Sequence, residues 1–212
     1  MDALGIRETY LTPFSREDGV RYAEANDEVL EVCRKFPGRF RAWARVQPKL
    51  GRAAADEVRR CRDAGAAGVF LQPQADTFYI ENCLDIFKIA DVGGFPVMLH
   101  TDHRPNAHPQ YWEGVFEKFH RVRFLLAHGG KDHYMEAADI ARRLDNVFLD
   151  TAAMPLERTR QAVEAAGIGK VLFCSDAPYS HAALEKLKYE LLAPGEAGLR
   201  GIFEENSRRF FL

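Results

Sequence analysis

The chain has 212 residues, of which 47% are hydrophobic and 28% are charged, and its formal net charge is −2. These values are typical of a soluble globular protein, and the length suits a single domain that spans residues 1–212. Lysine and arginine are scattered among aspartate and glutamate without a long run of one sign, so we expect no nucleic-acid partner.

The N-terminal sequence and the cysteines indicate a cytoplasmic protein. The segment MDALGIRETY lacks the basic and apolar regions of a secretory signal. No apolar stretch approaches the roughly 18 residues that a membrane-spanning helix needs, so we expect no membrane partner. The four cysteines lie far apart without a CxxC pair, which favours free thiols over a disulfide framework or a zinc knuckle.

Short β-rich runs alternate with helical patterns along the chain. The helical patterns repeat apolar residues at intervals of three or four, and two of them close on a glycine that can end a helix, Gly65 or Gly167. The predicted strands are 9–14, 40–48, 67–74, 96–101, 123–128, 147–152 and 170–176, and the predicted helices include 20–36, 54–65, 135–144 and 156–167.

Strands followed by helices imply right-handed βαβ units and a parallel sheet. The glycine-rich turn that follows an early strand in dinucleotide-binding sheets is missing. We therefore predict an α/β protein with a TIM-barrel-like (β/α) architecture. Seven predicted strands are one fewer than a closed barrel of this type has, so the prediction is an incomplete barrel of about seven βα units.

Four neighbouring strands end in groups that bind metals or protons. PVMLH ends at His100, RFLLAHGG contains His128, VFLD ends at Asp150, and KVLFCSDAP reaches Asp176. A lone histidine at a strand end is more often a hydrogen-bonded structural residue. Because parallel strands bring their carboxyl ends to one rim, the repetition instead favours a shared functional site.

The residue types at this rim suit a divalent metal ion, with zinc expected first and manganese second. Zinc takes imidazole nitrogen and carboxylate oxygen, and a catalytic site keeps one position open for water. We predict His100, His128 and Asp176 as metal ligands, with Asp176 also carrying protons and His128 also stabilising negative charge on the substrate. Asp150 can either brace the site or react.

Five segments in this order resemble the amidohydrolase-related (amidohydrolase 2) family. They are ANDEVLEVCRKFPGRFRAWARVQP, GAAGVFLQPQ, FPVMLHT, RFLLAHGG and VLFCSDAP. The family comprises metal-dependent (β/α)8-barrel hydrolases and the related aminocarboxymuconate-semialdehyde decarboxylases, so the resemblance implies that fold and a divalent metal. It places His100, His128 and Asp176 in the metal and catalytic site.

The chain departs from the family pattern at its beginning. The family pattern starts with a strand bearing His-x-His, which supplies two metal ligands, and this sequence contains no such pair. The position often filled by lysine and histidine in GVKLHPQ reads Phe70 and Gln72. Three interpretations stay open: a fragment or mis-started reading frame, a natural site with fewer or different ligands, and a protein that has given up catalysis.

Other residues near the rim receive simpler interpretations. Arg104 and Tyr179 follow the strand-end residues and are predicted to bind a substrate carboxylate or carbonyl. The remaining polar residues are interpreted in two groups: Asp102, His103 and His108 as a solvated loop or as substitute ligands, and His120, His133 and His181 as helix caps or surface groups.

A barrel without its first strand exposes two sheet edges, at 9–14 and 170–176, and unpaired edges invite pairing. The C-terminal tail LRGIFEENSRRFFL has a helical pattern and is expected to pack outside, as the last barrel helix. A tail packed outside cannot cover the open edges. We therefore predict that another copy of the chain covers them and that the protein is a homo-oligomer.

The leading hypothesis is a metal-dependent hydrolase, or a decarboxylase of the same family, that acts on a small carbonyl or carboxylate compound. The first alternative is a catalytically silent, truncated barrel kept for binding or assembly, and the missing His-x-His is its support. The second alternative is a TatD-like metal-dependent phosphodiesterase, against which the acidic balance argues.

Overall fold

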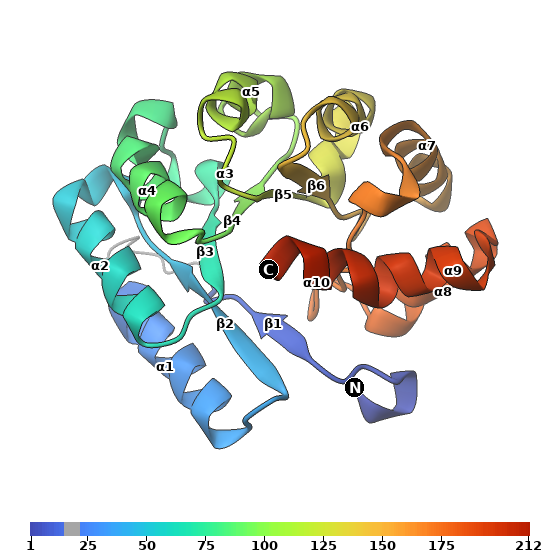
Figure 1. Ribbon diagram of the computed structural model, residues 1–212, viewed down its shortest axis with the longest axis horizontal. Helices are drawn as coiled ribbons and strands as arrows, with labels where there is room; N and C mark the ends of the chain where they lie inside the picture. The colour runs from blue at the N-terminus through green and yellow to red at the C-terminus, as the bar shows by residue number, and fades with distance from the viewer. Residues whose placement is uncertain (15–21) are drawn as a thin grey trace.

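Six parallel strands form one curled sheet in the computed structural model, which describes residues 1–14 and 22–212. The strands lie side by side in chain order, and helices cover the outer, convex side of the curl (Figure 1). The strands are β1 (Thr9–Leu11), β2 (Phe40–Arg45), β3 (Gly68–Leu71), β4 (Val97–His100), β5 (Phe124–Ala127) and β6 (Val147–Leu149).

The connections between successive strands contain helices, as parallel pairing requires. The α-helices are α1 (Tyr22–Lys35), α2 (Arg52–Asp63), α3 (Pro73–Asp76), α4 (Ile80–Gly93), α5 (Pro109–Lys118), α6 (Tyr134–Arg143), α7 (Leu156–Ala166), α8 (Ala182–Leu192), α9 (Gly195–Arg200) and α10 (Asn206–Phe211). Short helical turns add η1 (Asp2–Leu4), η2 (Pro48–Leu50), η3 (Pro105–Ala107), η4 (His128–His133), η5 (Ile168–Lys170) and the π-helical η6 (Gly201–Glu205).

The predicted α/β architecture is confirmed as a curled part of a TIM barrel with alternating strands and helices. The seventh predicted strand, 170–176, is reduced to one parallel bridge between Leu149 and Val171. Three predicted helices match α2, α6 and α7 closely. The predicted start of the first helix, at Val20, lies outside the described residues, and α1 is described from Tyr22.

Successive side chains on each strand point to opposite faces of the sheet, and both faces are apolar. In β3, Val69 and Leu71 belong to the large core between the sheet and its helices, whereas Phe70 faces the concave side. The concave side carries its own cluster of buried side chains. Its members are Trp43, Phe70, Met98, Leu125, Ala127, Phe148, Leu172 and Phe210.

The C-terminal helix α10 supplies Phe210 to this inner cluster. The Phe210 side chain is fully buried, and its ring lies 6.4 Å from Trp43 and 5.4 Å from Phe148 between centroids. The neighbouring Phe211 stacks on Tyr10 of β1 at 4.1 Å. The prediction that the tail packs outside the barrel was wrong, because the apolar concave face needs cover and the tail provides it (Figure 1).

Among residues 1–14 and 22–212, no helix combines the length and the apolar character needed to cross a bilayer.

Replacing Phe210 with alanine should destabilise the protein by about 3–5 kcal/mol, the usual cost of removing a buried phenylalanine, because it opens a cavity inside the curled sheet. Leu212→Ala is the matched control in the same tail, since Leu212 is 92% exposed and should change stability by less than about 0.5 kcal/mol. Urea unfolding measures both. Equal effects of the two substitutions would contradict the packing of α10 against the concave face.

Candidate active site

A cavity of about 1560 Å³ opens on the concave side of the sheet. Its wall includes His100, His128 and Asp176, the three residues that the sequence predicted as ligands, together with Asp150 and Tyr179. The three residues therefore share one cavity, although residues 170–176, which precede and include Asp176, contribute only a single β-bridge to the sheet. Arg104 is exposed and is not among the residues that line this cavity.

His100 and His128 meet because their strands are neighbours. His100 ends β4 and pairs in register with Ala127 of β5, so His128 follows immediately beside it. The two imidazole rings have centroids 4.7 Å apart with an interplanar angle of 69°, and both side chains are buried. Nε2 of His100 also lies 3.5 Å from Oδ2 of the buried Asp102.

The turn after β5 requires both of its glycines. Gly129 has φ +49°, and a Cβ there would lie 2.8 Å from the carbonyl oxygen of Asp150. Gly130 has φ +81°, and a Cβ there would lie 2.9 Å from Cγ of Pro109. Its backbone N–H donates to the hydroxyl of Thr101 at 2.8 Å. The sequence His-Gly-Gly thus folds η4 tightly against its neighbours and fixes the start of that segment at His128.

Left-handed backbone conformations concentrate around the cavity. Of the six non-glycine residues with positive φ in the described ranges 1–14 and 22–212, four line it: His128, Lys131, Ala153 and Asp176. Side chains disfavour this conformation, and such residues persist where the surrounding structure over-determines them, as happens at functional sites. The two predicted site residues His128 and Asp176 are both held in this way, at φ 63° and 51°.

Asp150 braces the turn that carries His128. Its Oδ1 accepts backbone N–H groups from His128 at 3.2 Å and from Ala152 at 2.9 Å. Its Oδ2 is buried without a hydrogen-bond partner among the described residues. Nδ1 of His128 lies 3.1 Å from the carbonyl oxygen of Ala152. Because a carbonyl oxygen can only accept, Nδ1 is the donor, and the neutral ring keeps its lone pair on Nε2.

Burial sets the protonation of the buried groups. It lowers the pKa of His100 to about 3, with the nearby His128 as the second cause, so His100 is neutral near pH 7. Burial raises the pKa of Asp176, an effect that His128 and Lys131 oppose. Burial also raises the pKa of Asp150, again against the influence of His128. Neutral imidazole is the form that binds metal ions.

The donor set suits a divalent cation in its chemistry, because it combines two imidazoles with carboxylates, one of which has an unpartnered buried oxygen. The donors are not gathered into a closed set. In the described part of the chain, one group of three His, Cys, Asp or Glu residues has all its ligand atoms within 4.8 Å of one another, and it lies elsewhere. Sharing an ion would therefore require the ligand atoms of these side chains to move closer together.

The sequence did not single out several charged residues of the cavity wall, among them Lys131 and Arg45. Lys131 lies in η4, and its charge lowers the pKa values of both His100 and Asp176. Arg45 ends β2 and forms a buried ion pair with Asp76 at 3.0 Å. Their positions in the sequence could have identified both residues, because Lys131 directly follows AHGG and Arg45 ends a strand.

Sequence comparison with curated proteins gives no significant match. The family model described as Amidohydrolase matches residues 16–212. The chain belongs to the amidohydrolase family. This family consists of metal-dependent enzymes, and the expected family is confirmed.

Solved structures with the same fold cover nearly the whole chain. The 5-carboxyvanillate decarboxylase from Sphingomonas paucimobilis has a TM-score of 0.80 at 18% identity, with 100% of this chain and 80% of that one covered. The 2,6-dihydroxybenzoate decarboxylase from Rhizobium has a TM-score of 0.78 at 21% identity, with 100% and 85% covered. An uncharacterised TIM-barrel protein from Bordetella bronchiseptica has a TM-score of 0.82 at 17% identity, with 99% and 79% covered. These similarities show the shared fold.

The low pKa of His100 predicts a pH dependence of stability. The unfolded chain binds a proton at this residue near its ordinary pKa of 6.5, whereas the folded protein binds it only near pH 3. As the pH falls below 6.5, unfolding is therefore favoured by up to about 1.4 kcal/mol per pH unit.

His100→Gln removes this proton, so its free energy of unfolding should fall less steeply with acid than that of the wild type. The measurement is urea unfolding of both proteins, in the presence of a chelator, between about pH 6.5 and pH 4, the interval in which the two ionisation states differ. Parallel curves for the two proteins would show that His100 is protonated in the folded state.

Proposed function

We propose that the chain is a metal-dependent enzyme that decarboxylates a small carboxylate compound, with hydrolysis of a small carbonyl compound as the alternative reaction. The observation that carries the proposal is the meeting of His100 and His128 in a cavity that Asp176 also lines. Family membership supports the dependence on metal. The similar structures named as decarboxylases support the reaction class and the substrate class.

In this proposal His100 and Asp176 hold the cation, and His128 lies beside it as a further ligand or as a partner of the substrate oxygen. When bound, the cation supplies Lewis-acid polarisation of the substrate. Zinc is the expected ion and manganese the second candidate. Manganese is bound in a solved structure of 5-carboxyvanillate decarboxylase from Novosphingobium aromaticivorans, a similar fold at 18% identity.

His128 is oriented for proton transfer or ligation. The contact between Nδ1 and the carbonyl oxygen of Ala152 fixes both the ring and its tautomer, which leaves Nε2 as the basic nitrogen. The left-handed backbone at His128 and the carboxylate of Asp150 hold the start of the turn in place. A histidine whose Nδ1 and backbone N–H are both hydrogen-bonded loses little freedom on binding substrate, which favours reaction geometry.

Lys131 and Asp176 complete the chemistry. The positive charge of Lys131 in the cavity wall attracts a substrate carboxylate. Decarboxylation breaks the bond between carbon and the carboxylate, carbon dioxide leaves, and the electron pair left on carbon takes a proton. We assign the delivery of that proton to Asp176, because its side chain lines the same cavity as His100 and His128. In the hydrolytic alternative Asp176 takes a proton from water and passes it to the leaving group.

The test is an assay of metal-stripped protein with a panel of small aromatic carboxylates, with zinc or manganese added back, and with carbon dioxide release and hydrolysis followed separately. Asp176→Asn and His128→Asn should lower kcat by about 100-fold or more, the usual effect of losing a proton-transferring group. His181→Asn is the control, because His181 is an exposed helix cap whose role asparagine preserves. Full activity without metal, or in Asp176→Asn, would refute the proposed chemistry.

The second candidate function is a catalytically silent relative. The observation that favours it is the spacing of His100, His128 and Asp176, which do not form a compact set of ligand atoms. Elemental analysis of the purified protein and of His100→Asn separates the two candidates. An ion that the wild type retains and His100→Asn loses supports the enzyme, and equal metal content supports the silent barrel.

Self-association stays a prediction. In the described part of the sheet, β1 pairs with β2 alone, and Phe211 covers Tyr10 on its concave side. We propose that a second copy of the chain shields the free edge of β1. Analytical ultracentrifugation tests this, and a monomer at micromolar concentration would contradict it.

A further inference from the structure

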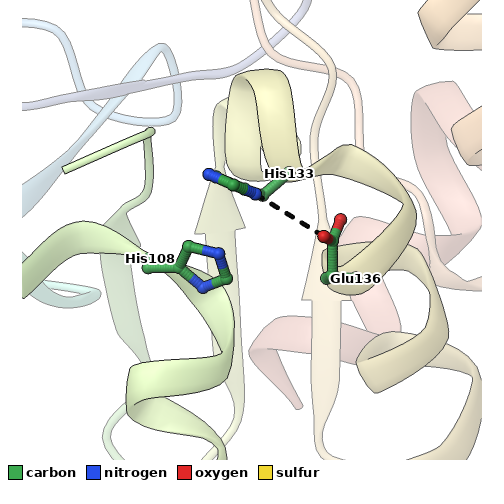
Figure 2. A group of neighbouring side chains, drawn as sticks. All are labelled: His108, His133 and Glu136. Atoms are coloured by element: carbon green, nitrogen blue, oxygen red, sulfur yellow. Dashed lines mark ion pairs between the residues drawn. The ribbon is translucent and has the colours of Figure 1, made fainter. Parts of the chain in front are cut away.

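Three side chains with metal-binding groups gather outside the cavity. His108, His133 and Glu136 each offer one ligand atom, and these atoms all lie within 4.8 Å of one another. Figure 2 shows the three side chains converging from separate elements, with the ion pair between His133 and Glu136 drawn as a dashed line. None of the three lines the cavity that holds His100 and His128.

The three residues come from two helix N-termini that pack together. His108 is the residue before α5, and its Nδ1 accepts the backbone N–H of Gln110 at 3.2 Å. His133 ends η4 directly before α6, and Glu136 lies in the first turn of α6. Gly130 allows this close packing, because it leaves room for Pro109 beside η4. Tertiary packing alone brings the two segments together.

The distances approach those of a metal site. Nδ1 of His133 lies 3.5 Å from Oε1 of Glu136, and the rings of His108 and His133 have centroids 3.9 Å apart. A tetrahedral zinc ion with bonds of about 2.0–2.1 Å holds its ligand atoms about 3.4 Å from one another. Small side-chain rotations therefore suffice to close the set, and all three side chains are only partly buried and free to make them.

The charges around the two rings favour one divalent ion over two protons. Two protonated imidazoles whose ring centroids lie 3.9 Å apart repel each other. A divalent ion needs both rings neutral and gains the negative charge of Glu136. The ion must compete for the His108 ring with the N–H of Gln110, which donates to its Nδ1. The hydrogen bond of a neutral helix cap is weaker than a bond between a metal ion and an imidazole.

We propose that His108, His133 and Glu136 form a second site for a divalent transition-metal ion, separate from the candidate active site, with zinc as the best-fitting ion. Two imidazoles and one carboxylate suit zinc, cobalt or nickel better than magnesium or calcium, which prefer oxygen ligands. Three protein ligands leave a position for water. The ion would tie α5 to α6 and hold the far end of η4, whose first residue is His128.

Zinc titration of the metal-stripped protein and of single variants, followed by calorimetry, tests the proposal. His108→Asn keeps an acceptor for the helix cap and removes the imidazole, and Glu136→Gln keeps the shape and removes the charge. Each should weaken zinc binding at this site by about 10–100-fold or more. The matched control is His181→Asn, the same substitution at a histidine cap whose Nδ1 accepts the N–H of Ala183 at 3.1 Å. It should bind zinc as the wild type does.

Two further results separate this site from the candidate active site. His100→Asn should retain the binding event that His108→Asn loses, whatever becomes of the first site. In spectra of the ¹⁵N-labelled imidazoles, zinc should shift the resonances of His108 and His133 in both the wild type and His100→Asn. The proposal is overturned if His108→Asn and Glu136→Gln bind zinc as tightly as the wild type, or if those two resonances do not move.

Discussion

The concave face of the sheet is the constraint on which the rest of this structure depends. A curled parallel sheet has an inner face that helices on the outside cannot cover, so side chains must fill it. Here the aromatic rings of Trp43, Phe148 and Phe210 pack together on this inner face. Phe210 comes from the last helix, so the end of the chain completes the core on which the strands rest.

Side chains alternate between the two faces of each strand, and this alternation forms both the apolar cluster on the concave face and the adjoining cavity. Met98 faces the concave side, and two residues later His100 faces the same side at the end of β4. Phe148 and Asp150 repeat the arrangement at the end of β6. On both strands, the side chains that face inward are apolar within the sheet and polar at or just beyond the carboxyl end of the strand. Burial follows from this geometry, and burial lowers the pKa of His100 and raises that of Asp150.

The segment η4 links the two candidate sites. It begins at His128, in the cavity wall, and ends at His133, beside His108 and Glu136. Its backbone is left-handed from His128 to Lys131, a conformation that dense packing has to stabilise. The carboxylate of Asp150 supports one end by accepting the backbone N–H of His128, and Gly130 farther along packs against Pro109 of α5. A ligand that binds at either end therefore acts on the same short segment.

The sequence by itself determined the parallel α/β architecture, the convergence of His100, His128 and Asp176 on one cavity, and the family. These features depend on local periodicity and on chain order, which a sequence displays directly. Only the tertiary structure decided that Phe210 packs inside, that Lys131 lines the cavity and Arg104 does not, and that His108 meets His133. Such contacts join segments far apart in the chain, and they depend on side-chain volume and on strained turns that no local pattern records.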